Sequence, residues 1–461
     1  MTMSIVPRVR APVLTLSPVS APPVAYVSPF SRTLARGQWA ALAVLLVWAL
    51  SCFWALRSAE VATRVVGHDT APSIVAAERI RSLLSDANRN LANMTLTYDL
   101  ETGPFSFAYR SDIADAETLM VDAAQNITYG DAEKTPIIAI LRGTAEYERQ
   151  VGRARMAGSG PKAVAADNLM RSSIIPATEA LEKANYDQLA FQYEIFAESK
   201  PWLTGLVALT SLGSLAVLVW LQIQMRRYAR RLINLGLAAA TIVVACVSIY
   251  IGFTFVSAGA ELRTAKSDAF DSVYALTTLS AVAADAGAAD GFWLVTYEDA
   301  ALRKKYDDLF QSLTKQILGV DPETAASDAE QNVRFEGLIG DELANLTFVG
   351  EDTAARAALN AWSEYLAIEK QMRKLQIEGR EVEAATIAGG DKPGQMNAAF
   401  GVFQRAVALT IKINQNAFDT AIASLEAKIN LGVYGALFAA WLVASAAAWL
   451  GIRRRLREYE F

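Results

Sequence analysis

The sequence predicts an all-α integral membrane protein, in which four transmembrane helices alternate with two extracytoplasmic up-down four-helix bundles. Composition is the first indication, because a chain of 461 residues that is 53% hydrophobic yet 20% charged is typical of membrane segments separated by soluble ones. The apolar residues are concentrated in four uncharged runs, each long enough to cross a hydrocarbon core as a helix. Between these runs apolar residues recur at helical spacing, and we find no alternating strand pattern of useful length.

The four apolar runs define the predicted organisation of the chain. A leader with six prolines comes first, and proline at this density disfavours both helix and sheet. The first run is longer than the apolar core of a signal peptide, so we expect an uncleaved anchor. In chain order, the predicted segments are a disordered Pro-rich cytoplasmic leader at 1–37, transmembrane helix 1 at 38–57, bundle 1 at 58–201, transmembrane helix 2 at 202–223, an Arg-rich cytoplasmic loop at 224–234, transmembrane helix 3 at 235–256, bundle 2 at 257–430, transmembrane helix 4 at 431–452 and an Arg-rich cytoplasmic tail at 453–461.

The charge distribution predicts the orientation. The leader, loop and tail together hold 12 Arg and 2 acidic residues, whereas residues 58–200 hold 20 acids and 14 bases. Residues 257–430 hold 26 acids and 16 bases. Short Arg-rich segments stay in the cytoplasm, and long acidic ones can be translocated. Both termini are therefore expected in the cytoplasm and both bundles outside it.

Glycine and proline mark the predicted helix ends within each bundle. In the first bundle, breaks are expected at Gly103-Pro104, at Gly130 and at 158–161. In the second bundle, breaks are expected near Gly319, near Gly350 and at 389–390. The first and last helices of each bundle are expected to run into the adjoining transmembrane helices without a break, giving an up-down-up-down arrangement.

The two halves also resemble each other at a fixed separation of 199 residues. Asp86-Ala87 aligns with Asp285-Ala286, and Ser73-Ile74 aligns with Ser272-Val273. A self-similar period of this kind predicts a duplicated span-bundle-span unit.

The residues needed for most catalytic sites are missing from the sequence. The single histidine is His68, so histidine-based triads and His-rich metal sites are not available. Next to Asp69 it is read as a solvated turn residue, with a pH sensor as the alternative. The apolar runs at 39–56, 202–223, 235–256 and 431–452 carry no charged residue and no proline, which disfavours a transporter. We expect no enzyme activity, no catalytic residue, no metal, no cofactor and no nucleic-acid partner.

Polar residues on otherwise apolar helices are the candidate ligand-binding residues. The alternative for each is exposure to solvent or a hydrogen bond to a neighbour in the bundle. The candidates are Asp86, Asn90, Asn93, Asp285 and Asp290.

Arginines in the loop and tail are the candidate docking residues for a cytoplasmic partner. Guanidinium groups form bidentate contacts with carboxylates and phosphates, while the alternative is that they set topology and contact membrane lipids. These residues are Arg226, Arg227, Arg230, Arg231, Arg453, Arg454, Arg455 and Arg457. Small residues recur every four positions along the fourth span, which permits close helix approach and leaves a homo-oligomer open.

Short motifs at 71–77, 85–88, 230–234, 268–272 and 455–459 resemble those of a group of four-pass bacterial membrane signalling proteins best known in actinobacteria. The paired bundles are also similar to the ligand domain of bacterial chemoreceptors. The resemblance to the actinobacterial group covers the chain from about residue 38 onward. It implies a bacterial cytoplasmic membrane location, an extracytoplasmic amino-acid-binding lipoprotein or small ligand as one partner, and a soluble serine/threonine kinase as another.

The function expected from these observations is a transmembrane sensor or signal adaptor that reports to a separate cytoplasmic effector. The alternative is a non-catalytic structural or scaffold subunit of a membrane complex, whose bundles only dock.

Overall fold

A computed structural model describes residues 29–99, 101–158, 160–229, 233–320 and 337–456. Most of the predicted leader, residues 1–28, lies outside this part of the chain. Within the described residues all regular secondary structure is helical, which confirms the predicted fold class. The helices, with η marking π-helical segments, are α1 Pro29–Arg64, η1 Val65–Thr70, α2 Ala71–Thr97, α3 Pro104–Gln125, α4 Asp131–Ala157, α5 Gly160–Leu169, η2 Met170–Ile174, α6 Ile175–Ala229, α7 Leu235–Arg263, η3 Thr264–Phe270, α8 Asp271–Val295, α9 Ala300–Leu318, α11 Leu338–Ala344, α12 Glu351–Ile377, α13 Glu381–Gly389, α14 Met396–Lys428 and α15 Leu431–Leu456.

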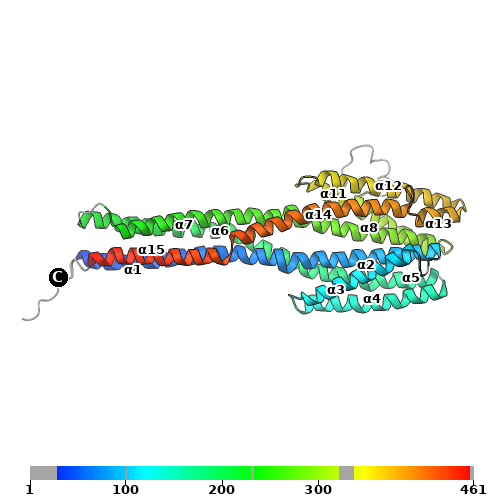
Figure 1. Cartoon of the computed structure of the whole chain (residues 1–461), viewed down its shortest axis with the longest axis horizontal. Helices are drawn as coiled ribbons and strands as arrows, with labels where there is room; N and C mark the ends of the chain where they lie inside the picture. The colour runs from blue at the N-terminus through cyan, green and yellow to red at the C-terminus, as the bar shows by residue number, and fades with distance from the viewer. Residues whose placement is uncertain (1–28, 100, 159, 230–232, 321–336, 457–461) are drawn as a thin grey trace, which may run out of the picture. The chain divides into compact units, whose positions relative to one another are not determined.

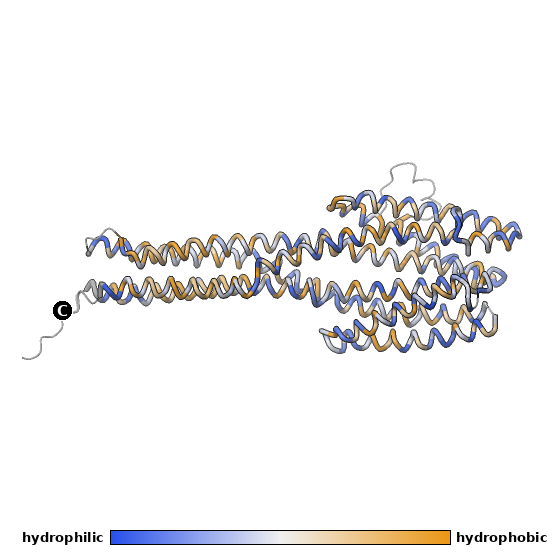
Figure 2. Tube along the Cα trace, viewed as in Figure 1, coloured by the Kyte–Doolittle hydropathy of each residue, from blue (hydrophilic) through white to orange (hydrophobic). Residues whose placement is uncertain are grey.

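Four of these helices contain the predicted membrane-spanning runs. The runs lie in α1, α6, α7 and α15, which are long and apolar enough to cross a membrane. Figure 2 shows apolar residues concentrated along these helices. The chain is therefore a multi-pass membrane protein by its helix length and composition.

The chain forms two compact units. The first, here called the membrane unit, consists of residues up to Leu50, Leu209–Ser248 and Leu437 onward. The second, here called the bundle unit, consists of Ser51–Ala208 and Ile249–Ala436.

Within the membrane unit, side chains bridge the apolar helices. Trp48 Nε1 donates to Ser248 Oγ at 2.9 Å, and Ser214 Oγ donates to the Val44 carbonyl at 3.1 Å. Asn234 Nδ2 donates to the Gly451 carbonyl at 2.9 Å, which fixes the start of α7 against α15. In a span, such bonds satisfy groups that lipid cannot.

Gly236 allows α7 and α15 to approach closely. A Cβ at this position would lie 2.4 Å from the Ala447 carbonyl oxygen and 2.9 Å from the Gly451 Cα. Because both atoms belong to the backbone, the Gly236→Ala variant must separate the helices. We expect a lower unfolding temperature for the full-length protein in detergent, measured by circular dichroism. Gly213→Ala in α6 is the control, because its Cβ meets no atom within 4 Å. Equal melting of the two variants would contradict this packing.

Within the bundle unit, each half of the sequence contributes one antiparallel bundle. The first consists of α2, α3, α4 and the α5–η2–α6 run. The marked glycines Gly103 and Gly130 precede α3 and α4, and Gly158 follows the end of α4. The second consists of α8, α9, α12 and α14, with the short helices α11 and α13 added. Gly319 ends α9 and Gly350 precedes α12, as predicted.

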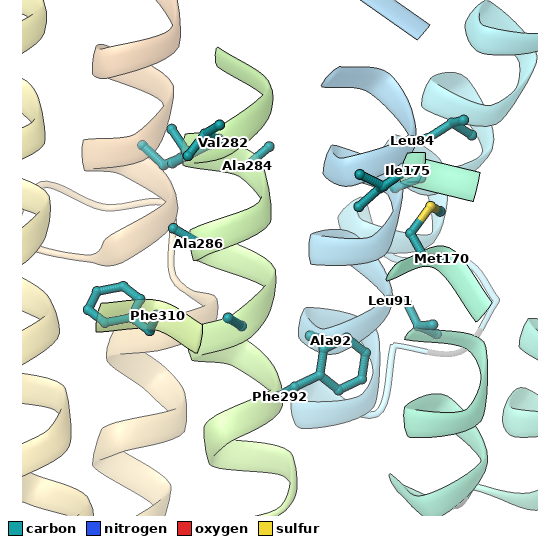
Figure 3. Close-up of a cluster of buried hydrophobic side chains, with 14 of the residues drawn as sticks. Leu84, Leu91, Ala92, Met170, Ile175, Val282, Ala284, Ala286, Phe292 and Phe310 are labelled. Atoms are coloured by element: carbon teal, nitrogen blue, oxygen red, sulfur yellow. The ribbon is translucent and has the colours of Figure 1, made fainter. Parts of the chain in front are cut away.

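The two bundles share one hydrophobic core. Helices α2 and α8 pack against each other along their lengths, with α3 and α4 on one side and α12 and α14 on the other (Figure 1). Figure 3 shows the Phe292 ring of α8 beside Ala92 of α2. At Gly291 an added Cβ would lie 2.7 Å from the Ala92 Cβ, so only small residues permit this contact.

The last helix of the second bundle does not continue into the fourth apolar run, so the predicted unbroken junction is wrong there. Helix α14 ends at Lys428 and α15 begins at Leu431. Asn430 separates them because its Oδ1 accepts hydrogen bonds from the Gly432 and Val433 amides, which makes it an N-cap. The α1–α2 and α7–α8 junctions remain helical, but η1 and η3 interrupt their α-helical geometry.

Candidate functional site

The five predicted ligand-binding residues all lie on the two central helices. Asp86, Asn90 and Asn93 are on α2, and Asp285 and Asp290 are on α8. The structure does not bring them into one site. It distributes them among separate polar clusters, two of which join the bundles.

The first cluster joins α2 to α14. The Asp86 carboxylate accepts from Arg89 Nε at 2.9 Å and from Gln404 Nε2 of α14. Asn397 Oδ1, two turns away on the same face of α14, accepts from Arg89 Nη1 at 2.7 Å and from Asn93 Nδ2 at 3.2 Å. The Arg89 guanidinium also lies 4.3 Å from the centre of a phenylalanine ring on α14. Two of the predicted residues therefore bond to the second bundle.

The second cluster joins η2 to α8 and α9. Arg171 donates from Nη1 to Asp285 at 2.6 Å and from Nε to Asp167 at 2.8 Å. Asp167, which is fully buried, also accepts from Tyr306 of α9 at 2.7 Å and from Asn88 of α2 at 2.8 Å. Burial raises the pKa of Asp285, although the Arg171 guanidinium opposes the shift. A buried carboxylate held by several donors is stable only while all of them are present.

These two clusters form a reciprocal pattern. Asp86 and Asp285, 199 residues apart, occupy matching places on α2 and α8. Each accepts a hydrogen bond from the last helical run of the other bundle, Asp86 from Gln404 and Asp285 from Arg171. Two hydrogen bonds thus join the bundles, and in each of them the last helical run of one bundle donates to the central helix of the other.

The third cluster lies within the second bundle. Arg373 of α12 pairs with Asp290 at 3.1 Å, and with Asp307 and Glu369. Burial raises the pKa of Asp290 to about 6 against the opposing charge of Arg373. Burial, followed by the charge of Asp290, raises the pKa of Glu369 to about 8. Burial and the neighbouring acids thus favour the neutral form of Glu369, while the Arg373 guanidinium favours its charged form.

A cavity of about 540 Å³ opens beside this cluster, between α9 and α12. Its walls combine apolar side chains, chiefly Phe310, Leu366 and Ile377, with Glu369 and Arg373. The Arg373 guanidinium lies 5.0 Å from the centre of the Phe310 ring.

Asn90 has a local role within the first bundle. Its Nδ2 donates to Asp112 Oδ2 of α3 at 2.8 Å. Burial and the charge of Asp86 raise the pKa of Asp112 to about 7. Asn90 therefore fits the alternative expectation, which is a polar residue that forms a hydrogen bond with a neighbour in its own bundle.

Sequence reasoning missed the partners of these residues. Asp167 with Arg171, and Glu369 with Arg373, are acid–arginine pairs four residues apart, a spacing that places both side chains on one helix face. The same spacing on exposed helix faces is common, so the pairs did not stand out.

The predicted docking arginines are described only in part. Arg226, Arg227, Arg453 and Arg454 are exposed, and the Arg453 guanidinium lies 4.4 Å from the centre of the Trp449 ring. Arg230, Arg231 and Arg457, with the side chain of Arg455, lie outside the described residues. Among the residues that are described, no group of three or more His, Cys, Asp or Glu side chains could hold a metal ion.

Comparison with known proteins gives one family match. The model of the actinobacterial sensor domain matches residues 62–194, which begin near the end of α1 and reach into α6. No curated protein and no solved structure matches the chain. The match supports a sensor protein of actinobacterial type.

Proposed function

We propose that this chain is a transmembrane sensor or signal adaptor that passes an extracytoplasmic ligand or binding-protein signal to a separate cytoplasmic effector, such as a kinase. The reciprocal linkage of the two bundles carries the proposal. A ligand or protein that changes the packing of one bundle must rearrange a hydrogen bond to the other. The match of residues 62–194 to a sensor domain supports this role for the first bundle.

The course of the chain supports transmission along helices. Helix α1 is followed by η1 and α2, and α7 by η3 and α8, without leaving helical conformation. Helix α6 includes residues of the first bundle and an apolar run within 55 residues. A shift of α2, α6 or α8 in the bundles would therefore be passed to helices that carry apolar runs.

The proposed topology places both bundles outside the cytoplasmic membrane and the arginine-rich segments inside. It rests on the charge bias of the sequence. Reporter fusions near residues 150 and 350 should be active only outside, and fusions after residues 228 and 461 only in the cytoplasm. A cytoplasmic signal at residue 350 would contradict two exported bundles.

The proposed partners are an extracytoplasmic solute-binding lipoprotein or small ligand and a cytoplasmic kinase. The test is affinity purification of the tagged full-length protein from its native membrane, with and without added amino acids, followed by mass spectrometry. If the chain is a sensor, the tagged protein should copurify with a cytoplasmic effector whose phosphorylation of its substrates changes when amino acids are added. Constant association that never responds would favour a scaffold subunit instead.

The arginines of the loop and tail give a sharper test of effector docking. Changing the four arginines of the loop and the four of the tail to lysine keeps their charge but removes the planar guanidinium fork. We expect normal insertion and a roughly fivefold weaker recovery of the effector, the loss that about 1 kcal/mol of docking energy produces. Lysine at Arg32 and Arg36, exposed arginines before the first apolar run, is the matched control. Unchanged recovery from the eight-residue variant would leave the arginines as topological anchors only.

A further inference from the structure

Two buried glutamates face each other in the second bundle. Glu342 of α11 is 2% exposed, and Glu351 at the start of α12 is fully buried. The Glu342 carboxyl faces the Glu351 carboxylate and the Ser272 hydroxyl, but neither of its oxygens forms a well-aligned hydrogen bond to a described residue. A buried carboxylate with no donor is strongly disfavoured in its charged form.

The partners of Glu351 favour its charged form. Its Oε2 accepts from the Thr347 and Phe348 amides at 2.7 and 2.8 Å. Its Oε1 accepts from Asn414 Nδ2 of α14 at 2.6 Å. Hydrogen bonds donated to a carboxylate stabilise the ionised state, so the proton of the pair belongs on Glu342.

The loop between these glutamates, residues 345–350, is fastened to η3 and the start of α8. Asn345 Nδ2 donates to the Ser267 and Asp268 carbonyls at 3.1 and 3.3 Å and to Ser272 Oγ at 3.0 Å. The glutamate pair therefore lies beside the contact that holds this loop to a π-helical segment.

The first bundle contains the same loop without the second glutamate. Glu133 Oε2 accepts from the Thr128 and Tyr129 amides at 2.7 and 2.6 Å. Asn126 Nδ2 points to Ser73 Oγ at 3.4 Å, the counterpart of Asn345 and Ser272. Three residues before Asn126, where Glu342 would be matched, the chain has Ala123. One bundle thus carries a buried acid that its partner lacks.

We propose that Glu342 and Glu351 share one proton, and that loss of this proton to water releases the 345–350 loop from η3, so that the second bundle contains a pH-dependent latch. When Glu342 is neutral, it can donate to the Glu351 carboxylate. When it ionises, two buried carboxylates face each other, and separation of α11 from α12 is the available relief.

Among the described residues, no positive charge is found to act on Glu342. Among the described residues of α8, α9 and α12, the charged group acting on it is Glu351. Asp271, adjacent to Ser272 in the chain, is bound to Lys266 at 2.9 Å. Burial, followed by the charge of Glu351, raises the pKa of Glu342 to about 8. The neutral form of Glu342 therefore predominates at about pH 6 and below, and it is lost as pH rises through about 8.

Hydrogen–deuterium exchange of the full-length protein in lipid nanodiscs tests the latch. Exchange is compared at about pH 6 and about pH 9.5 after correction for intrinsic rates, which brackets the ionisation. Peptides covering 264–272 and 345–352 should lose protection about tenfold or more at the higher pH, since one pKa unit is a tenfold change in population. Peptides covering the matched loop at 126–133 should keep their protection ratio.

Two variants decide whether Glu342 is responsible. Glu342→Gln keeps the shape of the protonated acid, and Glu342→Ala installs the residue of the first bundle. Both should keep the 345–352 region protected at about pH 9.5. The carboxylic acid C=O stretch assigned by infrared difference between wild type and Glu342→Gln should disappear in the same pH range. A pH response that persists in both variants, or a wild-type protein with none, overturns the proposal.

Discussion

Replacement of Arg171 by alanine is expected to destabilise the full-length protein by about 3–5 kcal/mol, the usual effect of removing one partner from a buried ion pair. Arg171 is the only cation bonded to both Asp167 and Asp285 among the described contacts. Without it, two buried carboxylates on opposite sides of the bundle contact lose their charge partner. The measurement is thermal unfolding in detergent, followed by circular dichroism and by exchange in α5 and α8.

The control for Arg171 is an ion pair of the same spacing on the surface. Lys304 and Asp308 are four residues apart on α9, bonded at 2.9 Å and largely exposed. Lys304→Ala should change stability by no more than about 0.5 kcal/mol. Arg171→Met combined with Asp285→Leu should recover part of the loss, because it removes one of the two orphaned charges and leaves that of Asp167. Equal effects of Arg171→Ala and Lys304→Ala would refute a buried network.

The second large effect is on the pH dependence of stability. Glu78 of α2 is fully buried, and neither carboxylate oxygen forms a well-aligned hydrogen bond to a described residue. Burial, and then contact with Glu182 of α6, raises its pKa to about 8, although Arg81 opposes the shift. Because the folded pKa lies above the unfolded value, stability is complete at low pH and falls as pH rises through about 8.

Glu78→Gln is expected to remove its share of this dependence, on the order of 4 kcal/mol between about pH 5 and pH 9. The measurement is the midpoint of chemical unfolding of the full-length protein across that range. Glu78→Gln should match wild type at low pH and exceed it at high pH. Glu146→Gln on the exposed surface of α4 serves as the control, and the opposite ordering would show that Glu78 is ionised in the fold.

The membrane spans and most helix ends could be predicted from the sequence because each depends on local composition. An uncharged apolar run determines a span, and a glycine after a periodic segment determines a helix end, and each depends only on residues close by in the sequence. The break before α15 was missed for a local reason as well. An asparagine directly before an apolar run, as at Asn430, is typical of an N-cap. However, the apolar periodicity of α14 continues through Ile429, and this favours a continuous helix.

The partners of the polar residues could not be predicted in this way. Helical periodicity and the 199-residue repeat drew attention to Asp86 and Asp285. Their partners, Gln404 and Arg171, are 318 and 114 residues away in the chain. A sequence pattern places a side chain on a helix face, but the neighbouring helix is chosen by packing of the whole core.

The break between α14 and α15 has a mechanical consequence. In a continuous helix the backbone hydrogen-bond ladder carries a rotation about the axis from one turn to the next. Residues 429 and 430 interrupt that ladder between α14 and α15, so we expect rotation of α14 to be passed to α15 less directly than it would be along one continuous helix. Displacement along or across the axis is still passed on, because Lys428 is paired with Glu261 of α7 and Tyr434 donates to Glu60 of α1 at 2.6 Å. We therefore expect the α14–α15 joint to transmit displacement of α14 to its neighbours more readily than rotation.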